Sequence, residues 1–387
     1  MDDYPHIAFQ KRWHISSNAT YLLGRCHAIV ESIGETPLDP DVYQEFLKVS
    51  LKKGAQATTA IEGNTLTDAE IDRIQQGERL PPSKTYQEKE VANILEAMNT
   101  ILGEVTTEGQ VQLVSPQFLL RFHKMIGKDL GETFEAVPGT FAQKSRVVGR
   151  YRAPLPEFVQ PLIEELCTWL KREFGYSQGN QSFADAVVQA IVSHVYLEWI
   201  HPFDDGNGRT GRLLELYILL RAGIPDIASH ILSNHYNDTR PQYYQMLERA
   251  KADDLTGFID YATLGLHDGL VKVRDAIQHE QFKVAWRSYI YDTFADVPYR
   301  KKEPFKRQRN LMLQVPLVGE YRLDELLSNI DLLREYGKLT EQTLMRDAAF
   351  LVKLGLLKKQ RGKYNANTSV LLGKRAQRLN LKKGKGR

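Results

Sequence analysis

The chain contains 387 residues, of which 42% are hydrophobic and 26% are charged, and it carries a formal net charge of +3. This is the composition of an ordinary globular protein with room for two or three domains, and so small a net charge implies no nucleic-acid or membrane partner by itself. Only two cysteines, Cys26 and Cys167, are present, which excludes a disulfide framework and favours a reducing compartment. The acidic start lacks an apolar signal segment, and no stretch approaches about 18 uninterrupted apolar residues. We therefore expect a cytoplasmic protein without a transmembrane helix.

Residues 1–112 are predicted to form an N-terminal helical region. Apolar residues recur at helical spacing in three stretches, which are 21–33, 42–61 and 90–101. The second stretch runs into Thr58-Thr-Ala-Ile-Glu-Gly-Asn64, a pattern typical of a helix that ends at a glycine cap. Thr67-x-x-Glu70 then has the spacing of a capping box that starts the next helix.

Residues 113–295 are predicted to form a second domain, again mostly helical, with apolar periodicity over 116–126 and 158–174. Between these two stretches, the segment from Pro138 to Pro154 has prolines at both ends and β-branched residues inside. We predict a short β-hairpin or flap here. A solvated loop rich in basic residues is the alternative.

The most informative stretch is His201-Pro-Phe-Asp-Asp-Gly-Asn-Gly-Arg-Thr-Gly-Arg212. An apolar run at 184–200 precedes it and a leucine-rich run at 209–221 follows, so it reads as a loop at the N-terminus of a helix. Unpaired amides at such an end favour an anion, and glycines let the anion approach the backbone. The candidate residues for phosphate, cation and proton chemistry are Gly206, Asn207, Gly208, Arg209, Arg212, Asp205 and His201. Each is common alone, but together they indicate phosphoryl or nucleotidyl transfer.

Residues 305–387 are predicted to form a third unit, which follows a charged, proline-marked connection at 295–305. One amphipathic helix is expected at 323–336 and a second at 340–352, followed by a β-like stretch with an Arg-Gly turn. This order resembles a winged helix-turn-helix, which is a DNA-binding module or a protein-interaction module. The tail at 374–387 carries seven basic and no acidic residues, which suits phosphate contacts or plain solvation.

The stretch from His201 to Arg212 is similar to the signature of the Fic (filamentation induced by cAMP) family, His-x-Phe-x-Asp/Glu-Gly-Asn-Gly-Arg-x-x-Arg, at every defined position. The resemblance implies a mainly α fold, with a Fic-type helical core and a small β-hairpin flap. It also implies a protein adenylyltransferase, which transfers AMP from ATP to a Ser, Thr or Tyr hydroxyl of a target protein. The roles it implies are His201 as general base, Asp205 as Mg²⁺ ligand, Gly206, Asn207 and Gly208 around the α- and β-phosphates, and Arg209 and Arg212 on the outer phosphates.

Beside such a core, Thr58, Glu62 and Gly63 are similar to the family's inhibitory motif, Ser/Thr-x-x-x-Glu-Gly/Asn. The resemblance implies that Glu62 pairs with Arg212 and keeps this guanidinium from the γ-phosphate. Because the motif precedes the core, the chain resembles the class with an N-terminal inhibitory helix. A plain helix end remains the alternative for this segment.

Family members place a tyrosine near adenine in the region that here holds Tyr236, Tyr243 and Tyr244, and Tyr243 is our candidate. Aromatic residues at helical spacing also occur in cores, so a packing role is the alternative. The flap departs from the family's usual Gly-x-Tyr/Phe-Arg pattern at Ala142, so its gripping residue stays open.

Two functions from different classes are predicted. The first is an adenylyltransferase that needs ATP and Mg²⁺ and is inhibited by its own N-terminal helix. The alternative is a DNA-binding transcriptional regulator in which the Fic core senses a nucleotide. A homodimer is expected if the C-terminal unit binds a palindromic site.

Overall fold

The computed structural model describes residues 4–106, 114–149, 151–175, 181–228, 230–298 and 302–372. It is mainly α-helical, which confirms the predicted fold class. The chain divides into two compact units, Met1–Asp275 and Ala276–Arg387, and each is described by itself. The predicted boundary at 112 and 113 lies outside the described residues, and the three-domain division stays a prediction.

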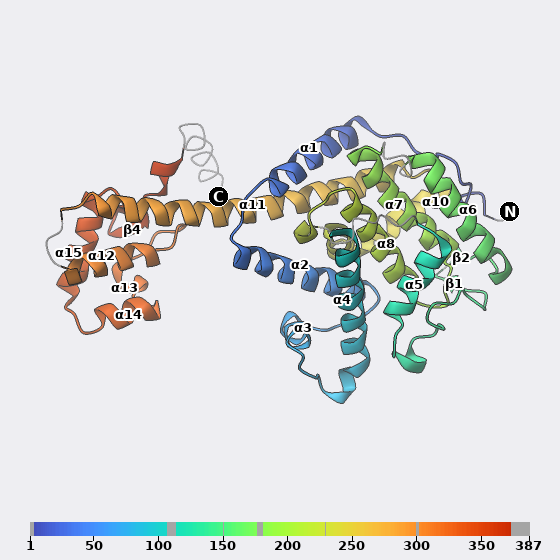
Figure 1. Cartoon of the computed structure of the whole chain (residues 1–387), viewed down its shortest axis with the longest axis horizontal. Helices are drawn as coiled ribbons and strands as arrows, with labels where there is room; N and C mark the ends of the chain where they lie inside the picture. The colour runs from blue at the N-terminus through green and yellow to red at the C-terminus, as the bar shows by residue number, and fades with distance from the viewer. Residues whose placement is uncertain are drawn as a thin grey trace. The chain divides into compact units, whose positions relative to one another are not determined.

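The N-terminal unit (Figure 1) contains most of the helices predicted from apolar periodicity. In chain order the α-helices of this unit are α1 (Ser17–Gly34), α2 (Pro40–Ile61), α3 (Asp68–Gln75), α4 (Thr85–Thr106), α5 (Pro116–Ile126), α6 (Pro156–Phe174), α7 (Phe183–Ile200), α8 (Asn207–Arg221), α9 (Ile231–Asp238), α10 (Arg240–Ala252) and the start of α11 (Thr256–Ala295). Apolar periodicity did not predict α9 or α11. The capping box predicted at Thr67 and Glu70 is present at the start of α3.

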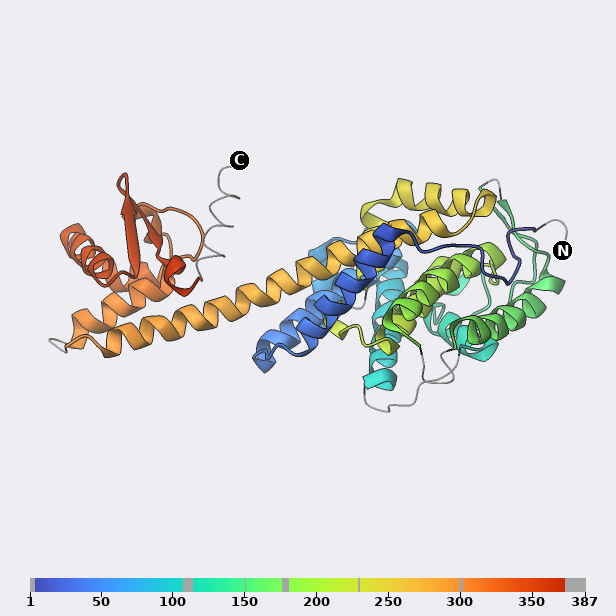
Figure 2. The same cartoon turned by 90° about the horizontal axis from the view of Figure 1, so that it is seen from above.

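Helices α7 and α8 form the centre of this unit and pack on each other. Every residue of α8 from Asn207 to Leu220 is buried, as expected for a helix enclosed on all sides. Helices α1, α2, α4, α5 and α6 contact this pair from different sides (Figures 1 and 2). The loop between α7 and α8 is therefore held by two rigid, buried elements.

The predicted flap is a short antiparallel hairpin of β1 (Val147–Val148) and β2 (Tyr151–Arg152). The Tyr151 hydroxyl donates a hydrogen bond to the Trp199 carbonyl at 2.5 Å, near the end of α7. The Ala142 amide likewise donates to the Pro202 carbonyl at 2.8 Å. These two bonds tie the hairpin segment to the loop that begins at His201.

The C-terminal unit contains the end of α11, four further helices and a second hairpin. These elements are α12 (Lys302–Gln314), α13 (Leu323–Leu326), α14 (Ile330–Tyr336), α15 (Glu341–Lys353), β3 (Leu357–Gln360) and β4 (Lys363–Ala366). Arg361 and Gly362 both have positive φ, 48° and 81°, as a tight two-residue hairpin requires. Tyr321 pairs with Tyr364 and extends the hairpin sheet by one bridge. The order of helices and hairpin is compatible with a winged helix-turn-helix, and that identification stays a prediction.

The single helix predicted at 323–336 is wrong, because the segment forms two helices. Asn329 begins the second one, with its side-chain oxygen accepting from the Asp331 amide at 2.9 Å and the Leu332 amide at 3.3 Å. A hydrogen bond from the following backbone amides to an asparagine side chain favours the start of a helix over the continuation of the preceding one. The basic tail at 374–387 lies outside the described residues.

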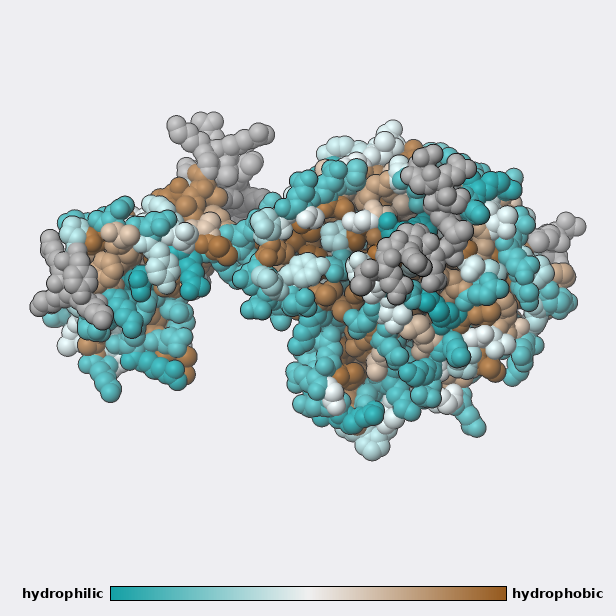
Figure 3. Space-filling model, in the orientation of Figure 1, coloured by the Kyte–Doolittle hydropathy of each residue, from teal (hydrophilic) through white to brown (hydrophobic). Residues whose placement is uncertain are grey.

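On both units, the face shown in Figure 3 is mostly hydrophilic, and smaller hydrophobic areas lie among the hydrophilic ones. In the part of the chain that the structure describes, no helix combines the length and apolar character needed to span a bilayer.

Candidate active site

The loop that joins α7 to α8 has a tight turn at each end and internal hydrogen bonds to a side chain. His201 caps α7 in a left-handed conformation (φ 51°), and Gly206 (φ 81°) makes the turn into α8. The Asn207 side chain bridges the loop, since its Oδ1 accepts from the Phe203 amide and its Nδ2 donates to the Phe203 carbonyl, both at 2.8 Å. Each such bond contributes about 1 kcal/mol, so the loop is preorganised.

The imidazole of His201 is partly buried at this loop. Burial is the main cause that lowers its pKa, to about 4, although the backbone of Glu198 and the charge of Glu62 raise it. Its Nδ1 is buried and has no hydrogen-bond partner among the residues that the structure describes. The ring is therefore neutral at pH 7 and able to accept a proton.

Asp204 and Asp205 are adjacent but have different partners. Asp204 holds the flap segment, accepting from Arg146 Nε at 3.1 Å and the Gln143 amide at 3.2 Å. Asp205 Oδ1 instead pairs with Arg209 Nη2 at 2.7 Å, and 27% of the Asp205 side chain is exposed. No group of three or more His, Cys, Asp or Glu side chains suited to a metal occurs among the described residues.

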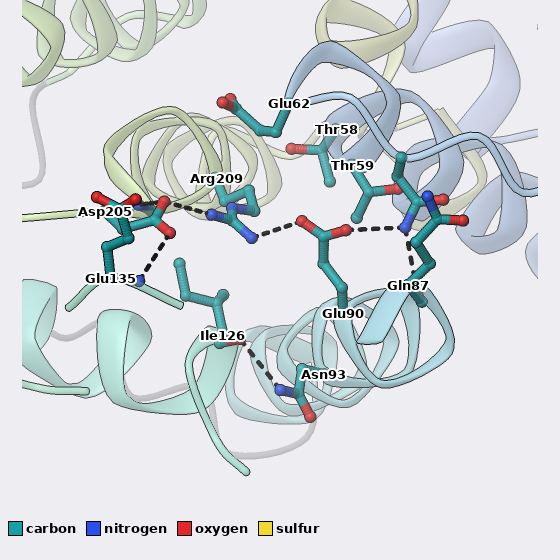
Figure 4. A network of polar contacts seen from close by, with 12 residues as sticks. Thr58, Thr59, Glu62, Gln87, Glu90, Asn93, Ile126, Glu135, Asp205 and Arg209 are labelled. Carbon is teal, nitrogen blue, oxygen red and sulfur yellow. Dashed lines mark hydrogen bonds and ion pairs between the residues drawn. The ribbon is translucent and has the colours of Figure 1, made fainter. Parts of the chain in front are cut away.

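The two arginines of the stretch are buried near the N-terminus of α8. Arg209 lies between two carboxylates, with Nη1 2.5 Å from Glu90 Oε1 and Nη2 bound to Asp205 (Figure 4). Burial lowers the pKa of Arg209, but Glu90 and Asp205 more than offset this effect. Arg212 contacts the last turn of α2 and the residue that caps it.

The candidate inhibitory segment contacts Arg212 directly. Arg212 Nε donates to Thr58 Oγ1 at 2.7 Å, and Nη2 donates to the Thr58 carbonyl at 3.0 Å and to Glu62 Oε1 at 2.5 Å. Gly63 follows with φ 101°, a conformation that favours glycine. Burial alone would raise the pKa of Glu62, but Arg212 and Arg209 lower it below the usual carboxyl value.

The Glu62 carboxylate also lies against the N-terminus of α8. A Cβ atom added to Gly208 would collide with Glu62 Oε1 and would stand 2.8 Å from Arg212 Nη1. Glu62 therefore occupies space beside the helix end where an anion is favoured.

The fold brings two further carboxylates to this site that were not predicted from the sequence, the buried Glu90 and the half-buried Glu198. Glu90 comes from α4, and only its burial distinguishes it from an ordinary surface residue. Glu198 interrupts the apolar run of α7, a signal that was visible in the sequence. Burial raises the pKa of Glu198 to about 7, although the nearby Arg212 lowers it.

The structure places the three candidate tyrosines differently from one another. Tyr243 is 1% exposed, its hydroxyl is 2.9 Å from His194 Nε2, and its ring stacks on Tyr236. Tyr244 is 50% exposed, and its hydroxyl is 3.4 Å from the Ile61 carbonyl, at the end of α2. Tyr244 therefore presents much more free surface than Tyr243. The adenine contact stays a prediction.

The position of Glu62 predicts an energetic coupling with Gly208. Gly208→Ala should destabilise the wild-type protein by about 1–3 kcal/mol, because the new methyl group overlaps the Glu62 carboxylate. In Glu62→Gly the same change should cost at least about 1 kcal/mol less. Urea unfolding of the four proteins measures the difference.

Gly24→Ala is the matched control, because a Cβ there meets nothing within 4 Å. Its effect should be the same in both backgrounds. If the effects of Gly208→Ala and Glu62→Gly simply add, the carboxylate does not lie at the start of α8.

Comparison with known proteins identifies the domain that contains this site. Residues 113–219 match the Fic/DOC family. Protein adenylyltransferase fic-1 of Caenorhabditis elegans is 29% identical over 204 residues, which are 53% of this chain and 37% of that protein. Protein adenylyltransferase Fic of Culex quinquefasciatus is 31% identical over 206 residues, 53% of this chain and 38% of that protein. The matches thus span less than two fifths of these relatives' length.

Solved structures show the same fold. A Fic family protein from Desulfovibrio desulfuricans G20 superposes with a TM-score of 0.56 at 21% identity, covering 92% of this chain and 98% of that one. Fic-1 of C. elegans (residues 134–508) superposes with a TM-score of 0.57 at 22% identity, covering 68% of this chain and 73% of that one. Residues 113–219 are therefore a region similar to the Fic/DOC family, and this region contains the complete signature from His201 to Arg212.

Proposed function

We propose that this protein is an adenylyltransferase that transfers AMP from ATP to a Ser, Thr or Tyr hydroxyl of a target protein. The observation that carries the proposal is a neutral His201 on the loop that opens into the amide-bearing N-terminus of α8. The relatives named protein adenylyltransferase support the same chemistry.

In the proposed reaction, His201 takes the proton from the acceptor hydroxyl as its oxygen attacks the α-phosphorus. The bond from the α-phosphorus to the bridging oxygen breaks, and pyrophosphate leaves with the bonding electrons. Amides of the Gly206–Gly208 turn hold the phosphates, and Arg209 and Arg212 neutralise their charge. The flap is proposed to bind the target's main chain as an added strand.

Asp205 is the proposed Mg²⁺ ligand. Mg²⁺ is commonly bound by one or two carboxylates together with substrate phosphates and water, so the single, partly exposed Asp205 fits this ion. When bound, Mg²⁺ would neutralise phosphate charge.

Glu62 is proposed to inhibit the enzyme. Its carboxylate occupies Arg212 and lies beside Gly208, where an outer phosphate would need to bind. Two negative charges about 4 Å apart repel by about 4 kcal/mol near a protein surface, which is enough to displace a phosphate from a productive position. Removing the carboxylate should free both the guanidinium and the helix end.

DNA binding remains the second candidate function. Five basic residues and no acidic ones lie between 353 and 363, on and around the C-terminal hairpin, and all five are exposed: Lys353, Lys358, Lys359, Arg361 and Lys363. Such a cluster suits phosphate contacts. A homodimer and a cytoplasmic location also stay predictions.

Transfer from α-labelled ATP tests the proposed function. Glu62→Gly should label itself or proteins of a lysate at least about tenfold faster than the wild type, since about 1.4 kcal/mol of relieved repulsion already gives that factor. His201→Ala in the Glu62→Gly background should abolish labelling, and mass spectrometry should find an AMP adduct.

No transfer by any variant, combined with salt-sensitive retention of duplex DNA, would favour the regulator. Equal rates for Glu62→Gly and wild type would contradict inhibition by Glu62 but not the transferase itself.

The lowered pKa of His201 predicts activity at acid pH. With a folded-state pKa of about 4, the ring keeps its base form well below 6.5. The labelling rate of Glu62→Gly should therefore change less than about twofold from pH 8 to 5.5, because general-base catalysis needs only the neutral ring. Circular dichroism at each pH confirms that the protein remains folded.

The free energy of unfolding, unlike the labelling rate, should depend on pH. Below pH 6.5 the unfolded chain binds a proton at His201 that the folded chain does not, so this residue makes folding less stable as the pH falls towards 4. If the labelling rate of folded Glu62→Gly instead falls to half its maximum near pH 6.5, the pKa of His201 is not lowered.

A further inference from the structure

Arg209 is proposed to bind phosphate, yet it already contacts two protein carboxylates. Its guanidinium lies between Asp205, in the loop before α8, and Glu90, on α4 (Figure 4). Both flanking ion pairs are short, at 2.7 Å and 2.5 Å. The role of Glu90, the second carboxylate, follows from this arrangement and rests on the proposed function.

Glu90 is the more deeply buried of the two carboxylates. Its side chain is 5% exposed, whereas that of Asp205 is 27% exposed. Both of its oxygens are used, because Oε1 accepts from Arg209 and Oε2 accepts from Asn64 Nδ2 at 2.8 Å. Asp205 is therefore the partner that solvent, or a metal, can reach.

Arg209 and a bound Mg²⁺ would compete for Asp205. If the Asp205 carboxylate turns towards the cation, its negative charge no longer compensates the Arg209 guanidinium. If Asp205 were the sole carboxylate partner, Arg209 would lose its only protein counter-charge, which is unfavourable for a buried guanidinium. Glu90 removes that obstacle because it stays paired with Arg209.

We propose that Glu90 is a positioning residue that holds Arg209 in place, so that Asp205 can exchange the guanidinium for Mg²⁺ when ATP binds. Glu90 does not touch the nucleotide. It acts through Arg209, and it is not part of the signature from His201 to Arg212.

The same residue links the inhibitory segment to Arg209. Asn64 comes two residues after Glu62, and its Nδ2 donates to the Gln87 carbonyl at 3.1 Å as well as to Glu90. The segment from Thr58 to Asn64 thus contacts Arg212 directly and Arg209 through Glu90. Movement of this segment would loosen both arginines together.

The test measures ATP binding by calorimetry in excess Mg²⁺ and in EDTA. The ratio of the two dissociation constants reports how much Mg²⁺ strengthens binding. In Glu62→Gly/Glu90→Gln this ratio should fall about tenfold relative to Glu62→Gly, because Arg209 then depends on Asp205 and competes with the cation. A tenfold change corresponds to about 1.4 kcal/mol.

Glu88→Gln is the matched control. Glu88 lies on the same helix, is equally buried, and also pairs with an arginine, but its partner Arg79 is exposed and distant from the signature in sequence. Glu62→Gly/Glu88→Gln should keep the parental ratio. Asn64→Ala removes the donor to Glu90 Oε2 but leaves the Glu90 carboxylate in place, together with its pair to Arg209. It should lower the ratio in the same direction by a smaller factor, and it guards against misfolding of Glu90→Gln.

The outcomes separate this inference from the proposed function. An unchanged ratio in folded Glu90→Gln, or in Asn64→Ala should Glu90→Gln not fold, overturns the role of Glu90, even if AMP transfer is intact. A lowered ratio without AMP transfer in any variant supports Glu90 and overturns the transferase. Absence of ATP binding in Glu62→Gly overturns both.

Discussion

An arginine side chain keeps its charge inside a protein, so Arg209 and Arg212, both buried near the start of α8, each need a carboxylate within reach. The fold supplies these carboxylates from separate elements. Glu62 follows α2, Glu90 belongs to α4, and Asp205 lies in the loop before α8. The packing of α2 and α4 on the central helices is therefore coupled to the charge balance of the site. Any ligand that takes over one arginine must replace a protein carboxylate.

This replacement gives a physical form to the proposed regulation. A triphosphate carries more negative charge than Glu62, so it can compensate Arg212 once the segment after α2 has moved. The closed loop around Asn207 and the two rigid helices beside it need not rearrange in that step. Neutral His201 is ready to accept a proton in the same loop, since burial rather than a partner lowers its pKa. The loop is thus preorganised, and in this structure the Glu62 carboxylate occupies Arg212.

Local sequence patterns predicted the parts of the structure that depend on neighbouring residues. The helices, the glycine turn at Gly206 and the capping box at Thr67 follow from spacing and backbone chemistry, and the structure contains them. The contact of Glu62 with Arg212 came from the family resemblance, because nothing in local spacing joins residues 150 positions apart. The prediction of one continuous helix at 323–336 was wrong. Its amphipathic pattern is continuous, but a hydrogen bond from the backbone to the Asn329 side chain starts a new helix there.

Long-range packing decided what local patterns could not. Glu90 resembles any solvated helix residue in the sequence, and only the fold places Arg209 beside it. Likewise, the sequence does not show that Tyr243 stacks on Tyr236 and is buried there. The central claim is that a triphosphate binds on the amides at the start of α8 when Glu62 is absent. A crystal structure of Glu62→Gly with ATP and Mg²⁺ tests it most directly. We predict the phosphates on the Gly206–Gly208 turn with the α-phosphate facing His201, whereas phosphates bound elsewhere, or a helix end still covered by protein side chains, would contradict the account.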